Sequence, residues 1–286
     1  MPRRRPPRVS LALNRGYGIA PRANDGAVTM ERHHARKRFG QNFLVDPHYV
    51  AKIVDAIAPK PGDNLVEIGP GLAALTGPLL ERAGHLTAIE IDRDLAARLA
   101  ADFPPERLSL RVADALDFDF STLGEALRIV GNLPYNISSP LLFHLARYET
   151  RLCDLHVMLQ KEVVARMTAA PATPDYGRLT VMLQTKFAVT RLFTVPAGAF
   201  RPAPKVESAV ARLVPLGAAK PALADEALLA RVVMAAFGQR RKTMRNALAG
   251  ICDARALESA GIDPGARGET LAVADLVRLA NSLAAR

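Results

Sequence analysis

Short apolar segments alternate with helical patterns over more than a hundred residues, and this alternation restricts the chain to few folds. The strand-like segments cover residues 64–68, 85–89, 108–112, 127–130 and 155–160. Helical patterns lie over residues 47–57, 93–100, 140–146 and 161–167, and one more follows a glycine turn and ends at residue 83. Strands and helices in strict succession form parallel βαβ units. The chain is therefore predicted to be an α/β protein with an open, mostly parallel sheet that binds ligands at the carboxyl ends of its strands.

The remainder of the chain divides into three further regions. Residues 178–187 have a helical pattern, and residues 188–195 and 206–214 are expected to close the sheet as an antiparallel pair. After residue 217 the pattern is wholly helical. The predicted domains are a basic, disordered extension (1–34), an α/β domain (35–217) and a small all-helical C-terminal domain (218–286).

A glycine turn follows the first of the alternating strands. Gly69, Gly71 and Ala74 match the pattern G-x-G-x-x-G/A, and Glu90 lies about 20 residues past the turn, where dinucleotide-binding proteins place a ribose-binding acid. Asp114 follows the third strand and either accepts a hydrogen bond from an adenine amino group or caps a loop turn. These residues indicate a nucleotide-like ligand and leave a nicotinamide cofactor open.

The segment Asn132-Leu133-Pro134-Tyr135 ends another apolar strand. The Asn132 side-chain oxygen and the Leu133 carbonyl, presented by a turn that Pro134 tightens, can accept hydrogen bonds from one exocyclic amine. Tyr135 can stack on the base that carries this amine. The alternative is an ordinary strand-to-loop turn with a packed tyrosine.

Phe200 lies in a proline-rich loop between the two closing strands. Prolines stiffen a loop, so this loop can hold Phe200 opposite Tyr135 as a second stacking surface. The alternative is a phenylalanine buried in the core.

Two clusters of basic residues are candidates for contacts with nucleic-acid phosphates. The first cluster precedes residues 39–46, and the second joins two helices of the C-terminal region; solvated charge runs are the alternative for both. Their members are Arg36, Lys37, Arg38, Arg240, Arg241, Lys242 and Arg245.

The charge of the chain is concentrated at its N-terminus. The formal net charge is +10, and residues 1–40 contribute ten basic and two acidic residues, a net of +8. Nucleic-acid binding by the folded body would therefore depend on local patches rather than on the overall field.

The composition also indicates which sites and compartments to expect. Two isolated cysteines, Cys153 and Cys252, offer no disulfide framework or metal-binding pair, which favours a reducing, cytoplasmic location. His33 and His34 have no partner cluster, so no metal is expected. No apolar run approaches the roughly 18 residues that a membrane helix needs.

Taken together, these motifs closely resemble the S-adenosylmethionine-dependent ribosomal small-subunit RNA adenine N6,N6-dimethyltransferases. The resemblance extends from about residue 35 to the C-terminus. The segments 39–44, 202–210 and 239–243 separate it from the related antibiotic-resistance methylases of large-subunit RNA. The five segments that carry it are Phe39-Gly40-Gln41-Asn42-Phe43-Leu44, Glu67-Ile68-Gly69-Pro70-Gly71, Gly131-Asn132-Leu133-Pro134-Tyr135-Asn136-Ile137-Ser138, Pro202-Ala203-Pro204-Lys205-Val206-Glu207-Ser208-Ala209-Val210 and Gln239-Arg240-Arg241-Lys242-Thr243.

The resemblance implies a Rossmann-like class I methyltransferase domain and a role for each matching residue. Asn42 and Leu44 would close over the cofactor, and Gly69 would line its amino-acid end. Glu90 would bind the ribose hydroxyls and Asp114 the adenine ring. Asn132 would serve both the cofactor and the acceptor amine, and Leu133, Pro134 and Tyr135 would complete the target site. Ala73 and Ala113 stand where the family usually has glycine.

The function that the resemblance implies is dimethylation of adenine N6 in small-subunit ribosomal RNA, by a monomer that acts during small-subunit assembly. Three other functions remain open at this point. A nicotinamide-dependent dehydrogenase fits the glycine turn but leaves residues 132–135 unexplained. A non-catalytic assembly or nucleic-acid-binding factor would retain the basic patches, and a DNA adenine methyltransferase would use the same chemistry on another polymer.

Overall fold

A seven-stranded sheet forms the centre of the computed structural model, which describes residues 42–239 and 241–285. Its strand order is β4-β3-β2-β5-β6-β9-β7; the strands from β4 to β6 are parallel, and β9 pairs antiparallel with both β6 and β7. The mostly parallel sheet and its antiparallel closing pair confirm the prediction. The strands are β2 (Asn64–Ile68), β3 (Leu86–Glu90), β4 (Leu108–Val112), β5 (Leu127–Asn132), β6 (Leu152–Gln160), β7 (Phe187–Val195) and β9 (Ser208–Pro215).

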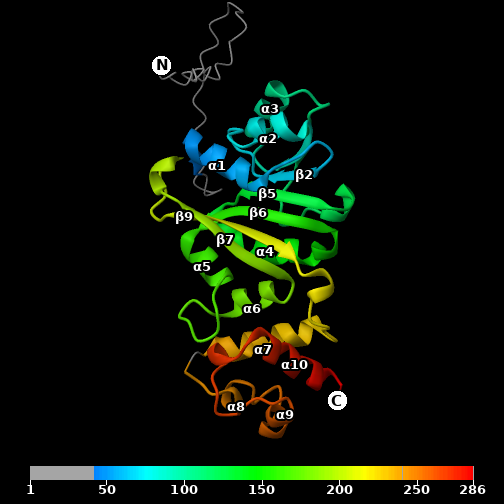
Figure 1. Cartoon of the computed structure of the whole chain (residues 1–286), viewed down its shortest axis with the longest axis vertical. Coiled ribbons are helices and arrows are strands. Elements are labelled where there is room, and N and C mark those ends of the chain that lie inside the picture. The colour runs from blue at the N-terminus through cyan, green and yellow to red at the C-terminus, as the bar shows by residue number, and fades with distance from the viewer. Residues whose placement is uncertain (1–41, 240, 286) are drawn as a thin grey trace, which may run out of the picture. The chain divides into compact units, whose positions relative to one another are not determined.

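Helices cover both faces of this sheet (Figure 1). Neighbouring residues of one strand enter different cores: Leu65 packs with α1 to α3, whereas Val66 packs with α4 and α5. The same alternation holds for Ile129 and Val130 in β5. Burial on both faces explains why the strands read as continuous apolar runs. The helices are α1 (Pro47–Ile57), α2 (Thr76–Ala83), α3 (Arg93–Asp102), α4 (Ser138–Leu145), α5 (Lys161–Met167) and α6 (Arg178–Gln184).

The start of α1 follows from local chemistry. Asp46 is its N-cap, and its side chain accepts a hydrogen bond from the His48 amide at 2.9 Å. Pro47 occupies the first helical position, where a missing N–H costs nothing. The helix ends before Ala58, which adopts a left-handed conformation (φ 46°).

A short second sheet lies beside α1. Strand β1 (Phe43–Leu44) pairs antiparallel with β8 (Phe200–Arg201), and Leu44 is in register with Phe200. The pair connects the beginning of the described chain to the loop that precedes β9.

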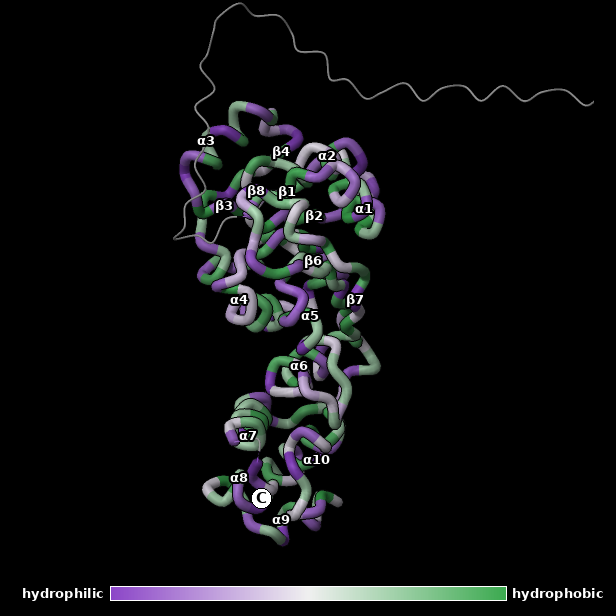
Figure 2. The backbone as a smooth tube through the Cα atoms, turned by 90° about the vertical axis from the view of Figure 1, so that its left-hand side faces the viewer, coloured by the Kyte–Doolittle hydropathy of each residue, from purple (hydrophilic) through white to green (hydrophobic). Residues whose placement is uncertain are grey.

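The C-terminal helices surround a third core, and α7 is coloured mostly hydrophobic in Figure 2. This core includes Tyr176 and Val181, which precede the predicted boundary at residues 217–218. The Tyr176 hydroxyl also donates a hydrogen bond to the Leu271 carbonyl at 2.8 Å. The helices are α7 (Glu226–Gly238), α8 (Met244–Ala247), α9 (Ala254–Ser259) and α10 (Val273–Ala284).

Buried charges connect the C-terminal helices to the sheet domain. The ammonium of Lys186 is almost fully buried and lies 2.7 Å from a carboxylate oxygen of Glu226, in the first turn of α7. The same ammonium donates to the Ala146 carbonyl at 3.1 Å and lies 3.6 Å from Glu149. Glu149 also pairs with Lys220, in the segment that leads to α7.

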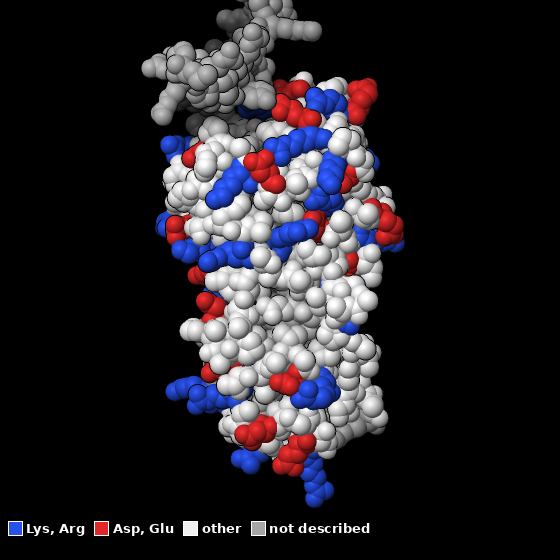
Figure 3. Space-filling model, viewed as in Figure 1, with Lys and Arg blue, Asp and Glu red and all other residues white. Residues whose placement is uncertain are grey.

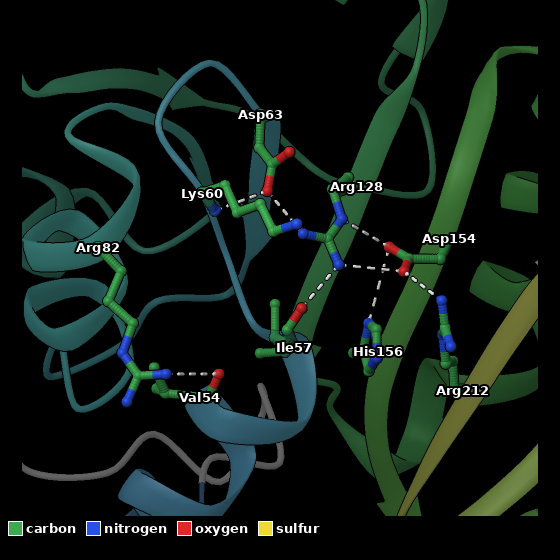
Figure 4. Close-up of polar contacts among 9 residues, drawn as sticks. All are labelled: Val54, Ile57, Lys60, Asp63, Arg82, Arg128, Asp154, His156 and Arg212. Carbon is green, nitrogen blue, oxygen red and sulfur yellow. Dashed lines mark hydrogen bonds and ion pairs between the residues drawn. The ribbon is translucent and has the colours of Figure 1, made fainter.

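A second polar cluster joins α1 to the middle of the sheet (Figure 4). Arg128 donates to Asp154 at 3.0 and 3.1 Å, to Asp63 at 2.6 Å and to the Ile57 carbonyl at 2.7 Å. His156 lies beside Asp154, with 3.7 Å between its Nδ1 and Asp154 Oδ1. Burial in this cluster lowers the pKa of His156 to about 4.

The predicted helix over residues 178–187 is too long. Helix α6 ends at Gln184, and Phe187 instead begins β7, where it pairs with Pro215 and is 2% exposed. The Thr185 hydroxyl donates to the Met182 carbonyl at 2.9 Å, at the point where the helix ends. Pairing with β9 and burial of the Phe187 ring outweigh the local helical pattern.

Candidate functional site

A cavity of about 300 Å³ opens at the carboxyl ends of β2, β3 and β5. The fold thus brings together residues that are more than ninety positions apart in the sequence, as the topology of a parallel sheet predicts. The sequence-predicted residues that line it are Asn42, Leu44, Gly69, Glu90, Asp114, Asn132, Leu133, Pro134 and Tyr135.

The glycine turn lets the backbone form one wall of this cavity. Gly69 and Gly71 have positive φ angles of 67° and 58°, which glycine adopts without steric cost. A Cβ atom on Gly71 would lie 3.1 Å from the Phe43 ring, so β1 closes directly over the turn. Ala73 is also left-handed (φ 65°), which explains why glycine is usual there and indicates local strain.

The charged groups among the described residues that line the cavity are all carboxyls. Glu67, Glu90 and Asp114 line it, whereas none of its described lining residues is Lys, Arg or His. Glu90 accepts hydrogen bonds from the Gly71 amide at 3.1 Å and the Asp92 amide at 2.9 Å, and burial raises its pKa. One Asp114 oxygen accepts from the Leu116 amide at 2.9 Å, so this residue both caps a turn and faces the cavity.

Glu67 is a cavity residue that the sequence reasoning did not single out. It is 2% exposed, its Oε2 has no hydrogen-bond partner among the described residues, and burial raises its pKa to about 7. The Thr76 hydroxyl opposes this shift, and the negative charge of Glu90 adds to it. The sequence could have indicated Glu67, because it is an acid inside the apolar run from Leu65 to Ile68, and a buried carboxyl without a partner is costly in free energy.

Asn132 connects the cavity to the start of the described chain. Its Nδ2 donates to the Asn42 carbonyl at 2.9 Å. This contact orients the amide, because only the nitrogen can donate to a carbonyl. No described residue donates to its Oδ1, which remains as an acceptor at the cavity wall.

Residues 133–135 are held by contacts on both sides. The Leu133 amide donates to the Met158 carbonyl at 3.1 Å, which fixes the backbone against β6. The Ser138 hydroxyl lies 3.1 Å from the carbonyl oxygens of Pro134 and Tyr135. The Tyr135 hydroxyl lies 2.7 Å from the hydroxyl of Ser208, the first residue of β9.

Phe200 does not line the cavity. It is 0% exposed and belongs to the core that also contains Leu44, Val195 and Val210. This position agrees with the alternative interpretation of the sequence, in which Phe200 is buried in the core. The stacking role of Phe200 stays a prediction.

The structure describes three cations of the C-terminal basic cluster, and all three are exposed: Arg241, Lys242 and Arg245. Thr243 forms a β-bridge with Arg267, and the Arg245 amide donates to the Pro264 carbonyl at 3.0 Å. Exposed Arg267 therefore belongs to this cluster. The sequence did not indicate this, because Arg267 is more than twenty residues away from the other members. Arg36, Lys37, Arg38 and Arg240 lie outside the described residues.

Further basic side chains gather on the sheet domain. Figure 3 shows a row of Lys and Arg across the part of this face where β7 and β9 lie. Exposed Arg191 is on β7 and exposed Arg212 on β9. Arg212 is partly neutralised, since it lies 3.2 Å from buried Asp154.

Residues 42–239 and 241–285 offer neither a metal cluster nor a membrane-spanning helix. No group of three or more His, Cys, Asp or Glu side chains there is placed to hold a metal ion. No helix in the same ranges is long and apolar enough to cross a membrane.

The sequence of this chain is similar to ribosomal RNA methyltransferases. The family described as "Ribosomal RNA adenine dimethylase" matches residues 32–285. Ribosomal RNA small subunit methyltransferase A of Aromatoleum aromaticum is 62% identical over 257 residues, which cover 90% of this chain and 97% of that protein. The protein of the same name from Thiobacillus denitrificans is 59% identical over 254 residues and covers 89% of this chain and 100% of its own length.

Two solved structures are similar over most of the chain. The 23S rRNA methyltransferase ErmE has a TM-score of 0.65 and 29% identity, covering 85% of this chain and 99% of its own. A dimethyladenosine transferase from Plasmodium falciparum has a TM-score of 0.72 and 24% identity, covering 83% and 95%. The second likeness is evidence of the shared fold.

Proposed function

Because the chain belongs to the ribosomal RNA adenine dimethylase family, we propose that its cavity is the site of methyl transfer from S-adenosylmethionine to N6 of adenine. The enzyme dimethylates adenines of small-subunit ribosomal RNA. The observation that carries the site assignment is Asn132, whose nitrogen is held by the Asn42 carbonyl and whose oxygen remains at the cavity wall.

The residues of the cavity fit S-adenosylmethionine. Its amino acid part carries an ammonium and its sulfur a positive charge, and the cavity offers three carboxyls without a described Lys, Arg or His. The unpartnered Oε2 of Glu67 is a ready acceptor for an ammonium. Glu90 would hold the ribose hydroxyls and Asp114 the adenine amino group. Asn42 and Leu44 would close over the cofactor, and Gly69 would line its amino-acid end.

The cofactor supplies a methyl group on a sulfonium, which is reactive enough to need no covalent enzyme intermediate. The residues of the chain orient the acceptor. Tyr135 stacks on an adenine held out of its helix, with Phe200 as the proposed second surface. Asn132 Oδ1 and the Leu133 carbonyl accept hydrogen bonds from the two N6 protons, so the nitrogen lone pair points toward the methyl group.

The same two acceptors stabilise the transition state. Methyl transfer would release the sulfur of the cofactor as a neutral thioether, and positive charge would develop on N6 as its bond to the methyl carbon forms. Hydrogen bonds from the N6 protons to fixed oxygen dipoles strengthen as this charge grows, which is the condition for lowering the barrier. The product nitrogen then loses a proton to water, and a second transfer to the same nitrogen completes dimethylation.

RNA contacts are proposed for both basic clusters: Arg36, Lys37 and Arg38 in the first, and Arg240, Arg241, Lys242 and Arg245 in the second. The proposed division is a basic extension (1–34), a methyltransferase domain (35–217) and a helical RNA-contacting domain (218–286). The third core, which includes Tyr176 and Val181, implies that the last two are closely joined. We further propose a cytoplasmic monomer that acts on the assembling small subunit.

The decisive experiment is methyl transfer from labelled S-adenosylmethionine to small ribosomal subunits from cells that lack the modification. Nucleoside mass spectrometry is expected to detect N6,N6-dimethyladenosine. Large subunits and DNA at the same salt concentration are the controls, because charge alone attracts any nucleic acid. Cofactor binding without transfer to any of these substrates would instead indicate a non-catalytic assembly factor.

A further inference from the structure

Ser208 is a buried polar residue with a direct contact to the proposed stacking ring. Its side chain is 0% exposed, and its Oγ lies 2.7 Å from the Tyr135 hydroxyl oxygen. Tyr135 follows the end of β5, whereas Ser208 begins β9. The two strands are not neighbours, since β6 lies between them in the sheet. The hydrogen bond therefore crosses the carboxyl end of β6.

The backbone around Ser208 is well anchored. Ser208 is in register with Gln160 of β6 and with Val195 of β7. The preceding residue is fixed as well: the Lys161 amide donates to the Glu207 carbonyl at 2.9 Å, and the Lys161 ammonium lies 2.8 Å from the Glu207 carboxylate. An anchored hydroxyl can restrain its partner, because it has few positions of its own.

The position of a tyrosine ring depends on two side-chain torsions. The Ser138 hydroxyl, 3.1 Å from the Tyr135 carbonyl, restrains the backbone end of this residue. The Ser208 hydroxyl restrains the opposite end, at the phenol oxygen. Both restraints together fix the direction of the long axis of the Tyr135 ring, and Tyr135 lines the cavity. Burial raises the pKa of the Tyr135 phenol, so the hydroxyl stays protonated and able to donate.

We propose that Ser208 is a positioning residue, which holds the Tyr135 ring in the orientation needed to stack on the acceptor adenine. The inference rests on the proposed function, because it assumes that Tyr135 contacts the base. A ring that is fixed before the base arrives loses little torsional freedom on binding. Errors of about 1 Å in the position of an acceptor can cost roughly a hundredfold in rate, so the restraint affects transfer itself.

The test is a double-mutant cycle with Ser208→Ala and Tyr135→Phe. Each variant removes the same hydrogen bond from one side, and Tyr135→Phe retains the stacking ring. Each single variant is expected to lower kcat by about tenfold on small-subunit RNA, with the cofactor Kd within about twofold of the wild type. The double variant should be no slower than either single variant, because the bond is already lost.

A matched control separates positioning from stability. Thr185→Ala removes another buried hydroxyl, which donates to the Met182 carbonyl at 2.9 Å outside the cavity. This control is expected to lower the melting temperature and leave kcat unchanged. If Ser208→Ala does not fold, the kcat of Tyr135→Phe alone tests the inference, since this variant removes the same hydrogen bond and leaves β9 intact.

Two outcomes would overturn the inference. The first is a Tyr135→Phe variant with the kcat of the wild type. The second is a loss of kcat from Ser208→Ala that is as large in the Tyr135→Phe background as in the wild-type background, because Ser208 would then act without the phenol hydroxyl. Both outcomes require a wild-type enzyme that transfers methyl groups. If the wild type shows no transfer, the proposed function fails, and this result differs from either outcome that would overturn the role of Ser208.

Discussion

At Asn132, the two ends of one amide have different tasks. The nitrogen binds the Asn42 carbonyl, and the oxygen is proposed to accept from adenine N6. Asn132→Ala removes this acceptor and is expected to reduce transfer by at least roughly a hundredfold, as for other lost transition-state contacts. Cofactor binding should remain measurable by calorimetry, because the carboxyls of the cavity are intact. Near-wild-type transfer would falsify the role of Asn132.

The buried carboxyl of Glu67 makes stability depend on pH. Its folded pKa of about 7 lies above the value of 4.5 expected in the unfolded chain. The folded state therefore retains a proton that the unfolded state has lost, and stability falls as pH rises between these two values. At pH 8 the accumulated penalty is about 3 kcal/mol.

Glu67→Gln is neutral at every pH and removes this dependence. Below about pH 4.5 the variant and the wild type should unfold at similar denaturant concentrations, and at pH 8 the cofactor-free variant should be more stable by up to about 3 kcal/mol. Urea unfolding at pH 5, 6.5 and 8 checks this expectation. A difference between the two proteins that does not change with pH would contradict it.

Among the secondary-structure elements, β5 leaves no room for a side chain beside β2 at Gly131. A Cβ atom there would lie 2.6 Å from the Ile68 carbonyl oxygen, which is closer than real contacts allow. Gly131→Ala must therefore separate the strand that carries Asn132 from the strand that leads to Gly69. We expect a loss of about 1–3 kcal/mol in unfolding free energy and weaker cofactor binding.

Gly77→Ala provides the control for this variant. Gly77 lies in the first turn of α2, and a Cβ atom there meets no atom within 4 Å. The control is expected to retain or slightly increase stability, because alanine favours a helix. Equal effects of the two substitutions on cofactor affinity would refute the steric argument.

In β6, His156 makes the stability of the fold depend on pH in the opposite direction to Glu67. Its folded pKa of about 4 lies below the value of 6.5 for the unfolded chain. The unfolded state therefore binds more protons between these values, and stability is lost as pH falls through this window. His156→Leu cannot take up this proton and should show a shallower loss in thermal unfolding between pH 6.5 and 4. An unchanged slope would show that other groups dominate acid unfolding.

For the whole molecule, recognition of a large RNA is proposed to depend on cations that lie outside the cavity. Replacing Arg241, Lys242 and Arg245 together by alanine is expected to weaken RNA binding and leave the cofactor Kd unchanged. The slope of log K against log salt should become shallower by about 2–3, since each lost phosphate contact contributes roughly 0.7–0.9.

Arg107→Ala is the control for the loss of an exposed positive charge away from the proposed RNA surface. Arg107 is exposed and immediately precedes β4, whereas the cavity lies at the carboxyl ends of the parallel strands. Its removal should leave the salt slope within error of the wild type. If the triple variant retained the wild-type slope, the C-terminal cluster would not contact phosphates.

Much of the fold was predictable because its signals are local. The bounds of α1, β4 and α5 agree with those predicted, since periodicity and capping residues act within a few positions. The prediction was wrong at residues 185–187, where β9 recruits Phe187 into the sheet. A pattern of neighbouring residues contains no information about a strand partner that lies about thirty residues away.

Local signals in the chain were enough to establish the succession of strands and helices, the glycine turn and the segment from Asn132 to Tyr135, because backbone preferences act between near neighbours. Three features became apparent in the folded chain alone: the Oε2 of Glu67 has no hydrogen-bond partner among the described residues, Phe200 is buried, and Ser208 reaches Tyr135 across β6. Contacts of this kind depend on which strands become neighbours in the sheet. That choice follows from packing of the whole chain, which no short stretch of sequence records.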